Sequence, residues 1–174
     1  VASALTKADV KLVLLLRDPR DIVVSRAKYI TRPHAGHRLH RYFTEVLTTD
    51  EGRVMACIRG VPAEHSGDGR ALGDIDTLIR SFLVWAKRHQ THLCRFEDLV
   101  GSQGGGSDPA QLEALKRLVE FLGVGIAQPE VESIARATFS KDSLTFRKGK
   151  IGDWRQHFTA EHKAAFLEHA GDLL

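Results

Sequence analysis

The stretch that decides the fold is VKLVLLLRDPRDIVVSRAKY, residues 10–29. It begins with an apolar run, Leu12 to Leu16, and a run without polar alternation predicts a strand buried on both faces of a parallel sheet. Asp18 is a candidate helix N-cap, and Pro19 suits the first helical position, where a missing N–H costs nothing. The stretch therefore predicts a strand, a tight turn and a helix.

The turn between this strand and this helix is a candidate anion site. Open α/β sheets bind ligands at the carboxyl ends of their strands, and free N–H groups at a helix N-terminus favour anions. Arg17 adds a planar cation suited to a phosphate, and Ser25 adds a hydroxyl that can donate to the same anion. The alternative is that Arg17 is only a surface ion-pair partner for Asp18 or Asp21.

The composition is typical of a globular protein. With 174 residues, of which 43% are hydrophobic and 27% charged, we expect one domain over residues 1–174. A net charge of +3 suits an anionic ligand but is too small to argue for a nucleic-acid partner. No apolar run approaches the ~20 residues of a membrane span. Cys57 and Cys94 lack metal or redox spacing, which favours reduced thiols and a cytoplasmic location.

Three histidines, His34, His37 and His40, recur at every third residue. Metal ligation is conceivable for such spacing. However, Pro33 and Gly36 interrupt a regular helix, and no carboxylate lies among the histidines. We therefore expect no metal site.

Loops and helices alternate along the rest of the chain. The pattern predicts a short helix over 39–46, a glycine-rich surface loop over 60–74 and a strand over 91–96. The glycine-rich segment GSQGGGS, residues 101–107, is expected to be a flexible connector.

Several longer helices are predicted from apolar stripes and caps. The first begins near residue 75 and carries a stripe that we expect in the core, formed by Ile75, Leu78, Ile79, Phe82, Leu83 and Ala86. Others are expected to begin at Asp108, with Gln111 at the capping-box position, at Pro129, and after Thr159, and Gly123 should end the one that begins at Asp108.

The second chemically rich segment is SKDSLTFRKGKIGDWRQHF, residues 140–158, with five basic and two acidic residues. Arg147, Lys148 and Gly149 offer a fork-shaped cation, a point charge and a bare backbone amide, a combination suited to an anion. A solvated basic loop is the alternative. The aromatic residues Trp154 and Phe158, with Phe146 and Ile151, argue against it, because they would hold the segment against the protein.

Three motifs in order resemble the PAPS-dependent sulfotransferase family of cytosolic and bacterial type. They are LLRDPRDIVVSRAKY (15–29), CRFEDL (94–99) and TFRKGKIGDWRQHFT (145–159). Their order and spacing also fit the family, so the resemblance extends over almost the whole chain. The resemblance implies a three-layer α/β/α fold with a mainly parallel sheet, related to P-loop nucleotide kinases. It implies a transferase that moves a sulfuryl group from PAPS (3′-phosphoadenylyl sulfate) to a hydroxyl or amine, leaving PAP, without a metal.

The resemblance also implies a set of nucleotide-binding residues. By position, Arg17 and Ser25 would hold the 3′-phosphate, and the loop of Arg147, Lys148 and Gly149 would close on it, with Phe146 beside them. Phe139 matches an aromatic residue that contacts the base. Phe96 stands where the family usually has Tyr near the adenine, so its hydroxyl is lost, and Ala137 replaces a common polar contact.

The largest departure from the family is an absence. The family's phosphate-loop lysine and its histidine base normally precede the strand at Val10, and neither can be placed in these residues. We therefore expect an N-terminally incomplete sulfotransferase domain, with its catalytic residues upstream of Val1. The alternative is a non-catalytic PAPS- or PAP-binding remnant of that fold. The acceptor, a small molecule or a lipid or carbohydrate, cannot be read from the loops at 31–41 and 60–74.

Overall fold

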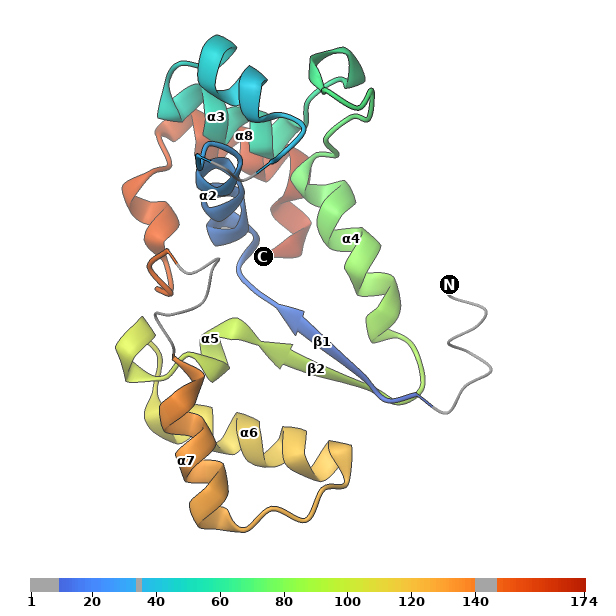
Figure 1. The fold of residues 1–174 in the computed structure, drawn as a ribbon, viewed down its shortest axis with the longest axis vertical. Coiled ribbons are helices and arrows are strands. Elements are labelled where there is room, and N and C mark those ends of the chain that lie inside the picture. The colour runs from blue at the N-terminus through green and yellow to red at the C-terminus, as the bar shows by residue number, and fades with distance from the viewer. Residues whose placement is uncertain (1–9, 34–35, 140–146) are drawn as a thin grey trace. The chain divides into compact units, whose positions relative to one another are not determined.

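The computed structural model describes residues 10–33, 36–139 and 147–174 (Figure 1). The chain forms two compact units, each assembled from two stretches. Unit 1 comprises Val1–Arg17 and Phe82–Ile151, and unit 2 comprises Asp18–Ser81 and Gly152–Leu174. The expectation of one domain stays a prediction.

Unit 1 is built around a parallel pair of strands. Strand β1 (Leu12–Leu16) pairs with β2 (Thr91–Arg95), with Leu12 opposite Thr91 and Leu16 opposite Arg95. Parallel neighbours need a long crossover connection, which here runs through residues 17–90. The pairing confirms the α/β class predicted from the sequence. Helices α5 (Phe96–Leu99), α6 (Asp108–Leu122) and α7 (Gln128–Thr138) also belong to this unit (Figure 1).

The prediction that β1 is buried on both faces is wrong. Val13 and Leu15 expose 46% and 57% of their surface, whereas their neighbours along the strand are half-buried. Among the described residues β1 has one neighbouring strand, β2, and α6 packs beside β2. The burial of an apolar strand depends on which elements cover it, and these cannot be predicted from the sequence of the strand alone.

Unit 2 is a helical cluster in which α2 (Pro19–Ile30), α3 (Asp50–Arg59) and α8 (Ala160–Ala170) pack together. The fully buried Val23, Ile58 and Phe166, one from each helix, mark its core. His162 joins α8 to α3 because its Nε2 donates to the carbonyl oxygen of Glu51 at 2.9 Å. Shorter turns lie at η1 (Tyr42–Val46), η2 (Ala63–His65), η4 (Asp153–Gln156) and η5 (Gly171–Leu173).

Helix caps explain most of the observed boundaries. Asp18 caps α2 by accepting from the Arg20 N–H, and Thr159 caps α8, both as predicted. Gly123 ends α6 in the left-handed conformation, also as predicted. Helix α6 begins at Asp108, as predicted, but the predicted capping box is wrong, because Ser107 is the N-cap and Gln111 donates to the Leu99 carbonyl.

Two helices differ from the expected pattern. The predicted apolar stripe of α4 (Ile75–Ala86) is in the core only over its first half, where Ile75 and Ile79 are buried, whereas Phe82 is 47% exposed. The helix passes from unit 2 into unit 1 after Ser81, and its last turn lacks the packing of its first. Helix α3 was not predicted, although Thr49 caps it and Gly60 ends it.

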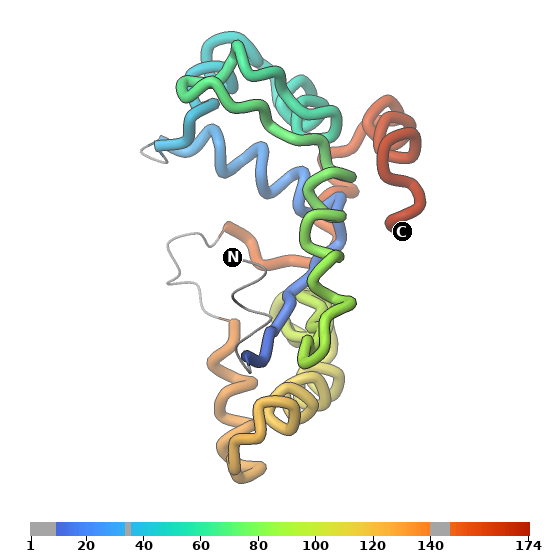
Figure 2. Tube along the Cα trace, turned by 90° about the vertical axis from the view of Figure 1, so that its right-hand side faces the viewer, coloured from blue at the N-terminus to red at the C-terminus, as the bar shows by residue number. Residues whose placement is uncertain are grey.

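The loop over 60–74 is a surface loop, as predicted, and it is fixed to its neighbours. Val61 and Leu72 form an antiparallel bridge across its base. Arg38 Nη2 donates to the Ala71 carbonyl at 2.9 Å, and Gly67 N–H donates to the Arg38 carbonyl at 3.0 Å, so the loop lies beside the segment before η1 (Figure 2).

Within the described parts of the chain, no helix is long and apolar enough to cross a membrane. The same residues contain no group of three or more His, Cys, Asp and Glu side chains that could hold a metal ion. Of the three histidines considered above, His34 lies outside the described residues.

Candidate functional site

Arg17 occupies the carboxyl end of β1, as the sequence predicted. Its guanidinium lies over the ring of Phe96, with 4.2 Å between the guanidinium carbon and the ring centroid. Its Nη2 donates to the carbonyl oxygen of Lys150 at 2.7 Å. A single cation therefore contacts the residue after β2 and the C-terminal basic loop, all within unit 1.

Phe96, whose ring Arg17 contacts, also lines an apolar cavity of about 250 Å³. Its walls come from the end of β1, from α5, from the end of α7 and from the basic loop, and are formed by Leu15, Phe96, Leu99, Val100, Thr138, Phe139 and Gly149. Ligand pockets typically measure about 300–1,000 Å³, so this one suits a single ring system better than a whole nucleotide. The structure thus brings together Arg17, Phe96, Phe139 and Gly149 of the predicted site.

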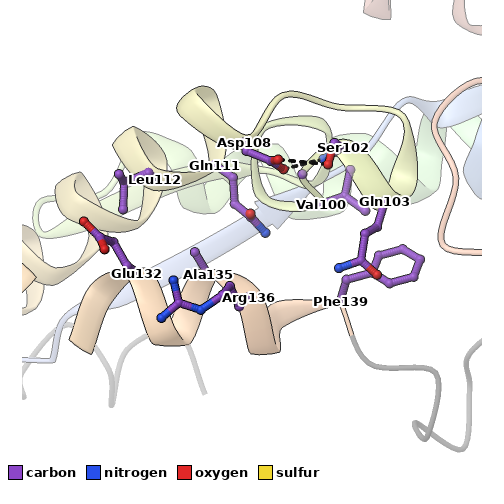
Figure 3. Close-up of a pocket in the computed structure, with 11 residues that line it drawn as sticks. Val100, Ser102, Gln103, Asp108, Gln111, Leu112, Glu132, Ala135, Arg136 and Phe139 are labelled. Carbon is purple, nitrogen blue, oxygen red and sulfur yellow. Dashed lines mark hydrogen bonds between the residues drawn. The ribbon is translucent and has the colours of Figure 1, made fainter. Parts of the chain in front are cut away.

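A second cavity, of about 300 Å³, shares two walls with the first. Val100 and Phe139 line both, but the second cavity is more polar, with Gln103, Glu132 and Arg136 among its lining residues (Figure 3). It lies between the segment 101–108 and helices α6 and α7. Sequence reasoning missed it, because residues 101–107 were expected to be a connector without fixed structure.

That expectation was wrong, since the glycine-rich segment folds into hydrogen-bonded turns. Ser102–Gly104 is a 3₁₀ turn, η3, and the Gly106 N–H donates to the Gly101 carbonyl at 2.8 Å. The carboxylate of Asp108 accepts from the Ser102 N–H at 2.8 Å and from its hydroxyl at 2.9 Å (Figure 3). Gly104 is buried.

The C-terminal basic loop is described from Arg147 onward, so Phe146 lies outside the described residues. Arg147 is half-buried and Lys148 is exposed. Gly149 has φ +60°, a backbone conformation that a side chain would strain. Beyond it, Lys150 accepts from Arg17, and the Ile151 N–H donates to the Gly104 carbonyl at 2.9 Å. The loop is thus held at two consecutive residues.

Ser25 and the start of α2 belong to unit 2. Ser25 is half-buried on α2, and its common site with Arg17 stays a prediction. At the helix start, Asp18 pairs with Arg20, with 2.7 Å between Oδ2 and Nη2. Burial alone would raise the pKa of Asp18, but the hydrogen bonds and charge of Arg20, with the charge of Arg155, outweigh it and lower that pKa.

Asp21 is a residue of this region that the sequence reasoning did not assign. Its side chain is 1% exposed, and its two carboxylate oxygens accept from the backbone N–H groups of Gly152 and Trp154, at 2.8 and 2.9 Å. Trp154 and Phe158 are buried, which confirms that they hold the end of the basic segment against the protein. The signal was a carboxylate in the first helical turn with a later Gly-Asp-Trp, and neither half is informative alone.

Comparison with known proteins gives consistent matches. The family model described as the sulfotransferase domain matches residues 1–174. Sulfotransferase 6B1 of Danio rerio is 25% identical over 169 residues, which cover 86% of this chain and 47% of that protein. The solved structure of mouse sulfotransferase SULT7A1 complexed with PAP superposes with a TM-score of 0.64 at 19% identity, covering 95% of this chain and 58% of that chain. The chain thus spans about half the length of these relatives.

Proposed function

The chain belongs to the sulfotransferase family, and we propose that it binds PAPS and serves the transfer of its sulfuryl group to a hydroxyl or amine. In that reaction the bond from sulfur to the bridging phosphate oxygen breaks and a bond from sulfur to the acceptor atom forms. The acceptor loses a proton, and PAP leaves. The mouse relative of similar fold was solved with PAP, which supports this choice of donor.

The observation that carries the proposal is the position of Arg17 between an aromatic wall and a basic loop. Its guanidinium lies over Phe96 and donates to the backbone of Lys150. An apolar cavity next to a cation matches the two ends of an adenosine phosphate, a flat base and an anion. The chemistry of the residues therefore fits the adenosine 3′-phosphate part of PAPS.

We assign the base to the apolar cavity. Phe96 and Phe139 would pack against the ring, and base–aromatic stacking is worth about 1–3 kcal/mol. Phe96 has no hydroxyl, so this wall contributes packing alone, and Thr138 supplies a polar atom at the same cavity.

We assign the 3′-phosphate to Arg17, Ser25 and the loop of Arg147, Lys148 and Gly149. Arg17 and Arg147 can each offer parallel N–H donors to two phosphate oxygens, and Lys148 adds a point charge. The absence of a side chain at Gly149 lets its backbone come close to the phosphate.

These residues anchor the donor, and we assign no catalytic residue among them. The 3′-phosphate is the end of PAPS remote from the sulfate, whereas transfer needs charge stabilisation at the sulfate itself. We therefore expect the 174-residue chain alone to bind PAP and to transfer no labelled sulfate. Turnover above background would contradict this expectation, and His34, His37 and His40 would then be substituted first.

Isothermal titration calorimetry with PAP and with adenosine 5′-monophosphate tests the binding proposal. Loss of the 3′-phosphate removes its charged hydrogen bonds, so PAP should bind about tenfold or more tightly than the monophosphate. Equal affinities would remove the phosphate assignment, and absence of binding by both ligands would remove the nucleotide site.

A further inference from the structure

The glycine-rich segment 101–106 contacts the basic loop at Gly104. The Gly104 carbonyl accepts from the Ile151 N–H at 2.9 Å. A Cβ placed on Gly104 would lie 2.5 Å from the carbonyl oxygen of Gly149 and would overlap a methyl group of Val100. The two backbones therefore approach at a distance that only glycine permits.

We propose that Gly104 is a positioning residue for the loop of Arg147, Lys148 and Gly149. The segment that carries Gly104 is itself fixed by the turn of η3 and by the bonds from Ser102 to Asp108. On its other side the loop is held by Arg17, through Lys150. Gly104 and Arg17 together set where the loop's backbone lies. This inference rests on the proposed function, because the loop matters here through its 3′-phosphate contacts.

A side chain at Gly104 could fit only if neighbouring atoms moved. Val100 is 5% exposed and β-branched, so its side chain has few alternative rotamers. The other neighbour is a backbone carbonyl, which can move only if the loop moves. Gly104→Ala should therefore displace the basic loop from the phosphate. Gly105 offers a matched control in the same turn, because a Cβ there meets nothing within 4 Å, although its φ is +90°.

The test measures the dissociation constants of PAP and adenosine 5′-monophosphate for the wild type, Gly104→Ala and Gly105→Ala. Their ratio isolates the 3′-phosphate, since a change in the base cavity affects both ligands alike. In Gly104→Ala the preference for PAP should fall by about tenfold, the lower end of the range for one lost charged hydrogen bond. Gly105→Ala should keep the wild-type ratio, although its backbone is the more strained.

The possible results distinguish the positioning role of Gly104 from the proposed function on which it rests. A wild type that does not prefer PAP overturns the proposed function, whereas a wild type that prefers PAP with an unchanged ratio in Gly104→Ala overturns only the positioning role. Should Gly104→Ala fail to fold, Val100→Ala/Gly104→Ala removes the overlap with Val100 and keeps that with Gly149. Measured against Val100→Ala alone, the double variant should show the same loss of preference, and an equal ratio in the two would overturn the inference.

Discussion

The buried carboxylate of Asp21 accepts a 2.9 Å hydrogen bond from the backbone N–H of Trp154, a residue more than a hundred positions later in the chain. Its second oxygen accepts from Gly152. Both donors are backbone groups at the start of the turn η4. The first turn of α2 therefore holds the start of η4 within unit 2.

Asp21→Ala should lower the free energy of unfolding by about 3 kcal/mol, because it removes two charged hydrogen bonds and leaves two N–H groups without a partner. Asp21→Asn should cost about 1–2 kcal/mol, since the amide keeps the shape and one acceptor. Urea unfolding followed by circular dichroism measures both. Asp172→Ala is the control, because Asp172 makes an exposed pair with Arg80, and exposed ion pairs contribute little to stability. Similar losses in Asp21→Ala and Asp172→Ala would contradict the structural role of Asp21.

Arg17→Ala should weaken PAP binding by about 2–3 kcal/mol, the scale of a lost charge-assisted hydrogen bond. Arg17→Lys should recover only part of this loss, because an ammonium group keeps the charge without the planar fork. Calorimetry gives both values, with Arg59→Ala, an exposed arginine at the end of α3, as the control. If PAP affinity is the same in Arg17→Ala as in the wild type, Arg17 does not belong to the site.

Phe139→Ala should weaken PAP and adenosine 5′-monophosphate equally, by about 1–3 kcal/mol, because both ligands carry the base that we place against this ring. This pattern differs from that of Arg17→Ala, which should affect PAP far more than the monophosphate. Phe82→Ala is a matched control, since Phe82 is an exposed aromatic residue on α4. A loss confined to PAP would place Phe139 at the phosphate and not at the base.

Asp18→Asn should destabilise the protein in a pH-dependent manner. The pKa of Asp18 is lower in the folded protein than its ordinary value of 3.8. Its ionised form therefore contributes stability that is fully present above pH 3.8 and is lost as the pH falls through the lowered pKa. The cost of the substitution should be about 1 kcal/mol at neutral pH and should shrink below pH 4. Unfolding measured from pH 7 to pH 3 tests this, and a cost that is constant over that range would contradict it.

The first strand and helix could be predicted in detail because their signals are local. An apolar run followed by Asp18 and Pro19 places the end of β1 and the start of α2. The exposure of Val13 and Leu15 could not be predicted in this way, because it depends on which elements lie beside the strand.

The candidate site was predictable to the extent that it reuses family motifs. Arg17, Phe96, Phe139 and Gly149 were expected together, and they meet around one cavity and its neighbouring cation. The contact between Gly104 and Ile151 was missed, because a glycine-rich string has the same local pattern whether it is loose or packed against a distant backbone.

The division of the chain into two units also has a consequence for folding during synthesis. Each unit needs two separate stretches, and the second stretch of unit 2 begins only at Gly152. Helix α3 packs against α8, which lies about a hundred residues later in the chain. Helix α3 is therefore synthesised long before its partner. Unit 1 has all of its residues once Ile151 has been added. Because domains generally fold as units, neither unit can complete its fold from its first stretch alone.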